Sequence, residues 1–230
     1  MHPFDFAGHR LALLADRALF WPKRHALLVA DLHLEKASWF AASGQMLPPF
    51  DSHATLSRLI TLAETTGARE IWALGDSFHD AIGPERLGGD AQNLIDRLAT
   101  GRRLVWIAGN HDARADLPGE RCDEAGVDGL ILRHEARIGE DRPELSGHFH
   151  PKVRIATAAR TVSRPCAAMG GNRLILPAFG ELTGGLDVRS PAIQSLFPQG
   201  GEALVATRQN LLRLALAEQA AKQPAGRRRH

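Results

Sequence analysis

The feature that most constrains the fold is an alternation of short apolar runs with helical patterns in the first half of the chain. The apolar runs cover residues 26–30, 71–74 and 104–108, and each ends at a glycine or an acidic residue. Between them, residues 51–66 place apolar side chains at i, i+3, i+4 and i+7, and residues 91–99 form a second amphipathic pattern. This alternation predicts an α/β layered fold. The polar residues after the strands should then lie at one edge of a sheet, where ligands bind in such folds.

The second half of the chain predicts mainly strands, at residues 129–132, 153–156 and 173–176. Residues 202–216 fit either a pair of strands or a strand running into a helix, and periodicity does not separate the two. We expect one domain over residues 1–217, followed by a flexible basic tail over 218–230, where the last apolar pattern has ended.

The composition is that of an ordinary globular protein, with 44% hydrophobic and 23% charged residues. No apolar run approaches the ~18–20 residues needed to span a bilayer, and Asp5 interrupts the stretch where a secretory signal would need an apolar core. We therefore expect a cytoplasmic protein with no membrane partner. Cys122 and Cys166 form no CxxC pattern and are expected to be reduced.

The net charge of +2 is not a sign of general nucleic-acid binding. Residues 218–230 alone contribute +3, so residues 1–217 sum to −1. A near-neutral body lacks the diffuse basic surface of a protein that coats nucleic acid, so any such contact must come from a local patch. Residues 227–229 could touch phosphates, although solvation of a charged tail is the more common role.

Five short motifs contain almost all of the unusual chemistry. In chain order they are Asp31-Leu32-His33, Gly75-Asp76, Gly109-Asn110-His111-Asp112, the separate His134, and Gly147-His148-Phe149-His150. Each one alone could be incidental, because an isolated His is usually a surface or satisfied core residue. Their joint occurrence, each after a strand-like run, predicts a metal site.

This ordered set resembles the calcineurin-like metallophosphoesterase superfamily over roughly residues 27–180. The resemblance implies a four-layer αββα sandwich, with mixed β-sheets flanked by helices. It also implies two metal ions that share one bridging carboxylate, that of Asp76. The first ion would be held by Asp31, His33, Asp76 and His150, and the second by Asp76, Asn110, His134 and His148.

Two cations ~3.5–4 Å apart can hold a phosphate oxygen, activate a bridging water and neutralise charge in the transition state. Mixed imidazole and oxygen ligands suit Mn, Fe, Zn or Ni better than Mg or Ca, and we expect Mn²⁺ first. By resemblance, His111 contacts the phosphate and protonates the leaving oxygen, while Asp112 holds the imidazole in place. Asp112 could instead be a surface acid or a loop cap.

Two more residues are candidates for substrate binding. His79 lies where protein phosphatases of the superfamily carry an Asp, in Gly75-Asp76-Ser77-Phe78-His79-Asp80, and this departure argues against a protein phosphatase. His79 could reach the phosphate or simply pack in its loop. Phe179 could wall the pocket or belong to the core. Trp39, Phe40 and Phe50 could stack on bases, although packing is the more common role of such residues.

Over residues 8–216 the chain is more specifically similar to the ligase-associated DNA damage response phosphoesterases. The similarity rests on "GHRLALLADRALFWPKRHALLVADLHLEKASWF", "LGDSFHD", "LSGHFHPKVRI" and "LILPAFGELTGGLDV". It implies a phosphodiesterase or nuclease, an endonuclease among the options, that acts in DNA repair beside an ATP-dependent DNA ligase and a helicase.

Two other functions stay open at this stage. One is a small-molecule (cyclic) nucleotide phosphodiesterase or nucleotidase, which would need the same metal centre. The other is a non-catalytic scaffold, which usually lacks a ligand or the catalytic His, whereas this chain has all seven ligand candidates and His111.

Overall fold

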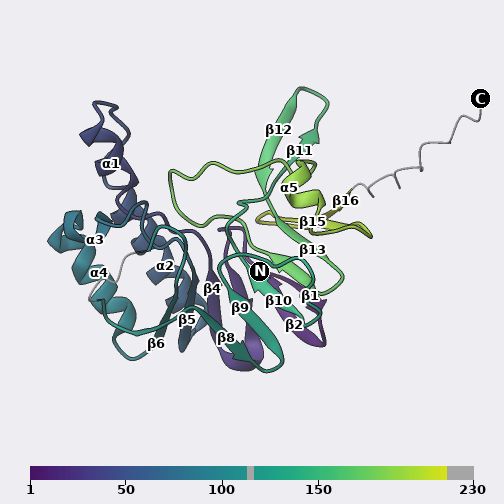
Figure 1. The fold of residues 1–230 in the computed structure, drawn as a ribbon, viewed down its shortest axis with the longest axis horizontal. Coiled ribbons are helices and arrows are strands. Elements are labelled where there is room, and N and C mark those ends of the chain that lie inside the picture. The colour runs from purple at the N-terminus through teal and green to yellow at the C-terminus, as the bar shows by residue number, and fades with distance from the viewer. Residues whose placement is uncertain (113–116, 217–230) are drawn as a thin grey trace, which may run out of the picture.

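The computed structural model describes residues 1–112 and 117–216, and its centre consists of two seven-stranded sheets (Figure 1). The first sheet has the order β1 to β7 and is antiparallel as far as β4, after which β4, β5, β6 and β7 run parallel. Its strands are β1 (His2–Phe6), β2 (His9–Leu13), β3 (Leu19–Trp21), β4 (Ala26–Val29), β5 (Glu70–Leu74), β6 (Arg103–Ile107) and β7 (Glu120–Cys122). The strands predicted at 26–30, 71–74 and 104–108 are thus confirmed, whereas β1, β2, β3 and β7 were not predicted.

Helices cover the outer face of the first sheet. The two longest are α2 (Asp51–Thr66), which is followed by Gly67 in the left-handed conformation, and α4 (Gly89–Ala99). The side chains that carry the predicted helical pattern of α2 are buried against this sheet together with those of α4, so both predicted helices are confirmed. The shorter helices in this half are η1 (Pro22–Arg24), α1 (Lys36–Ala42) and α3 (Gly83–Arg86).

The second sheet has the strand order β16, β15, β13, β14, β10, β9, β8. Only β10 is parallel to its neighbours, β9 and β14. The strands are β8 (Glu124–Val127), β9 (Leu130–Arg133), β10 (Glu144–Ser146), β13 (Ala167–Gly170), β14 (Arg173–Ile175), β15 (Gly201–Ala206) and β16 (Leu211–Leu216). Residues 202–216 therefore form a pair of strands, which settles the alternative that periodicity left open.

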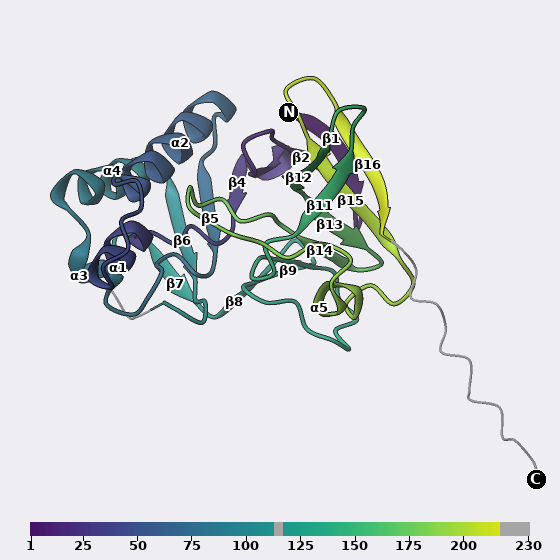
Figure 2. The same cartoon turned by 90° about the horizontal axis from the view of Figure 1, so that it is seen from above.

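The hydrophobic side chains form three layers, as a four-layer sandwich requires. One lies between the helices and the first sheet, one between the two sheets, and one on the outer face of the second sheet. The last layer is covered by the short α5 (Pro191–Gln194) and by a separate hairpin of β11 (Lys152–Ala156) and β12 (Thr161–Pro165). Seen from above, the helices α1 to α4 and this hairpin lie at opposite ends of the molecule (Figure 2). The predicted fold class is confirmed.

Within the described residues, both cysteine thiols are free, and no helix is long and apolar enough to cross a membrane. The predicted tail, residues 218–230, lies outside the part of the chain that the structure describes.

Candidate metal centre

The loops after β4 and β10 bring together three side chains that we call the inner cluster: Asp31, His33 and His150. Nε2 of His150 lies 3.5 Å from Oδ1 of Asp31 and 3.2 Å from Nε2 of His33. One potential ligand atom from each residue lies within 4.8 Å of the other two. Residues more than a hundred positions apart in the chain therefore converge at one point.

A second group, the outer cluster, consists of Asp76, His134 and His148, which follow β5, β9 and β10. Nε2 of His134 lies 3.4 Å from Oδ1 of Asp76 and 3.1 Å from Nδ1 of His148. These three residues meet the same 4.8 Å criterion. Both sheets thus contribute to each cluster.

The carboxylate of Asp76 lies between the two clusters. Its Oδ1 faces His134, while its Oδ2 is 4.0 Å from Nε2 of His33 in the inner cluster. Since this carboxylate is almost fully buried, its two oxygens are held toward the two sets of imidazoles. This is the geometry expected of a bridging ligand.

The backbone at the clusters is strained. Five of the seven predicted ligands adopt left-handed φ angles between 44° and 69°: Asp31, His33, Asp76, His148 and His150. Such conformations cost of order 1–3 kcal/mol each and persist where the surrounding structure imposes them. The fold therefore gives up stability to aim these side chains inward.

Two glycines make the close approach of the loops possible. A Cβ atom on Gly109 would collide with the backbone and carboxylate of Asp76, and one on Gly147 would meet Oδ2 of Asp31 at 2.5 Å. Any side chain at these two positions would push a carboxylate out of its cluster. The glycines in the GNHD and GHFH motifs are therefore part of the site's construction.

The imidazoles are held in the form that a metal ion needs. Burial, followed by the neighbouring His150 and Lys36, lowers the pKa of His33 to about 2, so this ring is neutral at ordinary pH. Nδ1 of His134 lies 3.2 Å from the carbonyl oxygen of Leu74, to which it can only donate. That bond leaves the lone pair of Nε2 directed toward Asp76 and His148.

The residues present fit two divalent cations. Paired imidazole nitrogens 3.1–3.2 Å apart fall within the separation of about 3.0–3.4 Å that two ligands at ~2.1 Å from one ion would have between right-angled and tetrahedral geometry. Nitrogen and carboxylate donors in each cluster suit a transition metal. The prediction of two metal sites from the motifs thus agrees with the two clusters.

Asn110 and His111 follow β6 and lie at the open side of the centre. The amide nitrogen of Asn110 is 3.4 Å from Nδ1 of His148, which brings the side chain to the outer cluster. The imidazole of His111 is half exposed, with Nε2 3.9 Å from Oδ2 of Asp76, and its ring centre is 6.0 Å from that of His33. Its backbone N–H donates to Oδ1 of Asp76 over 3.1 Å. His111 therefore sits beside the bridging carboxylate and reaches solvent.

The structure gives Asp112 a different role from the one implied by resemblance. Its Oδ1 accepts the backbone N–H of Phe78 and its Oδ2 that of Gly109, over 3.1 and 2.9 Å. Burial raises the pKa of this carboxyl despite those bonds. Because both oxygens are used by the backbone of the two loops, Asp112 braces the loops that carry Asp76 and Asn110 instead of holding the His111 imidazole. The alternative of a loop cap fits better.

His79 and Phe179 differ sharply in position. His79 lies beside the inner cluster, with its ring centre 5.7 Å from His33 and 6.3 Å from His111, and burial lowers its pKa. Phe179 is fully buried in the core beneath the helices, with the guanidinium of Arg58 over its ring. The prediction that Phe179 contacts substrate is therefore wrong, because no part of the side chain reaches the surface.

Helix α1 places aromatic side chains beside His79. The ring centre of Trp39 lies 4.9 Å from that of His79, and Trp39 and Phe50 are exposed by 39% and 77%. The packing role that is more common for such residues therefore does not describe Phe50, whereas Trp39 packs against His79 and Phe40 and leaves part of its ring exposed. The carboxylate of Glu35 accepts hydrogen bonds from the hydroxyls of Ser38 and Ser52, which ties the start of α1 to α2.

Two charged residues near the clusters were missed in the sequence because no motif marks them. Lys36 lies close enough to His33 and His79 to lower the pKa of both imidazoles. Oε1 of Glu135 lies 3.6 Å from Nε2 of His148, the ring nitrogen turned away from His134. A carboxylate in that place orients a metal-ligating imidazole. In the sequence, the position of Glu135 directly after His134 was the only signal of this role.

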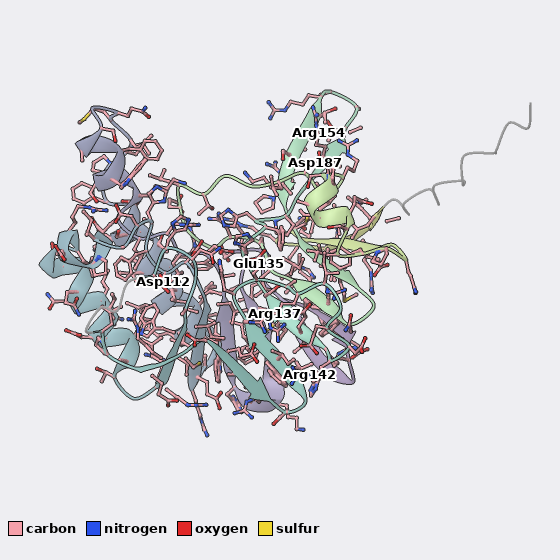
Figure 3. All side chains as sticks on the ribbon, in the orientation of Figure 1. Asp112, Glu135, Arg137, Arg142, Arg154 and Asp187 are labelled. Atoms are coloured by element: carbon pink, nitrogen blue, oxygen red, sulfur yellow. The ribbon has the colours of Figure 1, made fainter. Side chains whose placement is uncertain are left out.

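The outer cluster borders an open groove of about 810 Å³. Asn110, His134, Arg137, Ile138 and Phe149 are among its lining residues. Glu135 and Arg137, two of the lining residues, lie near the middle of the molecule, as Figure 3 shows. A ligand larger than a single phosphate has room on this side.

Two face-to-face mixed sheets and a double Asp/His cluster at their strand ends define a metal-dependent phosphoesterase. The crystal structure of Pseudomonas putida nuclease MPE matches 93% of this chain and 99% of its own, at 31% identity and a TM-score of 0.72. The chain belongs to the calcineurin-like metallophosphoesterase superfamily and, within it, to the ligase-associated phosphoesterases.

A phosphoesterase from E. coli, Yfce, also matches, at 14% identity over 84% of this chain and 99% of its own, with a TM-score of 0.44. No protein-family model and no curated protein sequence matches the chain.

Proposed function

We propose that this phosphoesterase is a nuclease that hydrolyses phosphodiester bonds of DNA with two divalent cations. The observation that carries the proposal is the position of the Asp76 carboxylate between the two clusters, 3.4 Å from one imidazole and 4.0 Å from the other. The similarity to a nuclease over nearly the whole chain supports a nucleic-acid substrate.

The cations would be held by the seven side chains at the two clusters. Asp31, His33 and His150 would hold one, His134, His148 and Asn110 the other, and Asp76 both. Bound there, the ions would polarise the phosphate, activate a water and offset charge in the in-line displacement. We propose Mn²⁺ as the native metal, with Fe, Zn or Ni as alternatives, because each cluster mixes imidazole with carboxylate.

The chain's own residues would position the substrate and move the proton. His111 would donate a proton to the leaving sugar oxygen, a role supported by its exposure and by its place beside Asp76. Asp112 would keep the loops of Asp76 and Asn110 in register through its two backbone bonds. His79 and Lys36 lie on the inner side, where a phosphate oxygen could accept their hydrogen bonds.

A substrate panel with added Mn²⁺ tests the proposal. We expect turnover of single-stranded, duplex or nicked DNA and of bis-p-nitrophenyl phosphate, with loss of both on chelation of the metal. Turnover of 2′,3′-cyclic nucleotides without DNA cleavage would make the protein a nucleotide phosphodiesterase. Full metal content without turnover of any diester would make it a scaffold.

We also propose that the enzyme acts in DNA repair in the cytoplasm, together with an ATP-dependent DNA ligase and a helicase. This rests on the likeness to the ligase-associated family. Deletion of the gene should sensitise cells to DNA damage, and a point variant at Asp76 should fail to restore resistance. Full restoration by that variant would contradict a catalytic role in repair.

A further inference from the structure

We infer that the hairpin β11–β12 is a phosphate-binding arm that holds a polynucleotide strand beyond the metal centre. The inference rests on the proposed function, because it needs a nucleic-acid substrate. Residues 152–164 contain four cationic side chains and no acidic one: Lys152, Arg154, Arg160 and Arg164. Residues 1–217 as a whole carry a formal charge of −1, so this is a local concentration of positive charge.

The arm begins at the metal centre. β11 starts two residues after His150 of the inner cluster, and the hairpin forms a two-stranded sheet of its own. It projects from the same side of the molecule as α1 (Figure 1). At about 3.3 Å per residue, the Cα of Arg154 lies at most about 13 Å along the chain from that of His150. That distance corresponds to about four nucleotides at 3.4 Å each. A polynucleotide strand bound at the metals is therefore long enough to come within reach of the Arg154 side chain.

The hairpin is firmly built despite its polar surface. Val153 is buried and Ile155 half buried against the outer face of the second sheet. The cations occupy both faces of the ribbon, because Arg154 is the cross-strand partner of Ser163 and Arg164 that of Val153. At the tip, the hydroxyl of Thr157 accepts the backbone N–H of Arg160 over 3.1 Å. The charged side chains therefore extend from a defined scaffold.

These cations form no close ion pair, although Arg154 lies near enough to Asp187 to help lower the pKa of that carboxyl after the larger effect of Arg189. Within the parts of the chain that the structure describes, none of the four forms an ion pair within 4 Å, and Arg154, Arg160 and Arg164 are exposed. The neighbouring acid, Asp187, binds the guanidinium of Arg189 at 2.9 Å, and Figure 3 shows Asp187 close to Arg154.

Other surface arginines are paired more tightly. Arg103 makes two hydrogen bonds to Glu120, and Arg213 makes two to Glu202. Guanidinium groups that hydrogen-bond no carboxylate can form charge-assisted hydrogen bonds with phosphate oxygens. Such contacts hold the strand without reading its sequence.

The test compares the triple variant Arg154→Ala/Arg160→Ala/Arg164→Ala with the unchanged hairpin. Binding of a fluorescent single-stranded oligonucleotide is measured at several salt concentrations in full-length protein carrying His111→Ala, which slows cleavage. We expect affinity to fall at least about tenfold at low salt. The slope of log affinity against log salt should shrink by about 2, since each lost phosphate contact removes about 0.7. In the otherwise native enzyme, hydrolysis of bis-p-nitrophenyl phosphate should stay within about twofold, because a small diester does not reach the hairpin.

The matched control is Lys23→Ala/Arg69→Ala/Arg102→Ala. These residues precede β4, β5 and β6, at the edge of the first sheet opposite the clusters. Their substitution removes the same three positive charges as the hairpin variant does. An equal loss of affinity in the control, or an unchanged affinity in the hairpin variant, would contradict the inference that the hairpin binds phosphates. Absence of any diester hydrolysis in the native enzyme would instead refute the proposed function. The binding comparison would still show whether the hairpin binds a polynucleotide.

Discussion

The inner and outer clusters use similar side chains but differ in how they meet solvent. The inner cluster is the more enclosed: Asp31 is fully buried, its carboxylate accepts the backbone N–H of His148, His33 is neutral through burial, and the side chain of His150 is only 18% exposed. In the outer cluster, the side chain of His148 is 30% exposed, and Asn110 lies at the surface beside the open groove. An ion in the inner cluster would be kept by the fold, whereas one in the outer cluster would stand where ligand and solvent enter.

The largest effect is expected from Asp76→Ala, which removes the side chain shared by both clusters. The outer cluster would then have no carboxylate and the inner cluster only that of Asp31, so both ions should be lost or bound far more weakly. Metal analysis should fall from near two equivalents to well below one, and turnover should fall to background. Asp96→Ala, on the exposed face of α4, is the control. Retention of one full equivalent in Asp76→Ala would show that the carboxylate does not bridge.

A paired comparison of His33→Ala and His148→Ala tests the difference between the clusters directly. Both variants should lose about one equivalent of metal at limiting Mn²⁺. Excess Mn²⁺ should restore far more activity to His148→Ala, because water can enter the exposed outer cluster and replace the missing ligand. Titration of activity with Mn²⁺ measures this. Equal rescue of the two variants would mean that burial does not distinguish the clusters.

His111→Ala should separate chemistry from metal binding. We expect near-normal metal content and a loss of roughly 10²–10⁴ in turnover, the usual range for one acid–base group. The loss should be larger for DNA, whose sugar oxygen is a poor leaving group, than for bis-p-nitrophenyl phosphate. An equal loss on both substrates would favour positioning of the phosphate, and an emptied metal site would contradict the assignment of the ligands around Asn110.

The smallest effect is expected from Glu135→Gln, which acts only on the outer cluster through Nε2 of His148. Loss of a carboxylate that orients a metal-ligating imidazole weakens metal binding by about 10–100-fold, and the exposure of Glu135 favours the lower end. Competition with a chelator should show that one ion is bound more weakly than in the native enzyme and that the affinity for the other is unchanged. Glu124→Gln is the matched control, since Glu124 pairs with Arg133 and Arg137. Weakening of both ions would contradict the separation of the clusters.

Strands β4, β5 and β6 and the helices α2 and α4 could be predicted, because these strands are unbroken apolar runs and the helices show a 3.6-residue pattern between them. The strands that escaped prediction are β1, β2, β3, β7, β8, β10, β12 and β13. They have three to five residues and owe their form to pairing with neighbours. Phe179 shows the same limit, because an aromatic residue near a motif can line a pocket or fill the core, and only the packing around Arg58 decides which.

The sequence by itself determined the kinds of ligand and their order: carboxylates after β4 and β5, an amide after β6, and imidazoles after β9 and β10. Those motifs are local, and their chemistry is a property of the residue types. Only the tertiary structure decided that Asp76 lies between two clusters and that Asp112 accepts hydrogen bonds from the backbone of two loops. It also decided that the outer cluster is more exposed to solvent than the inner one. Each of these depends on hydrogen bonds and solvent exposure set by segments that are distant in the chain. Asp31 and the backbone N–H of His148 that it binds, for example, are 117 positions apart.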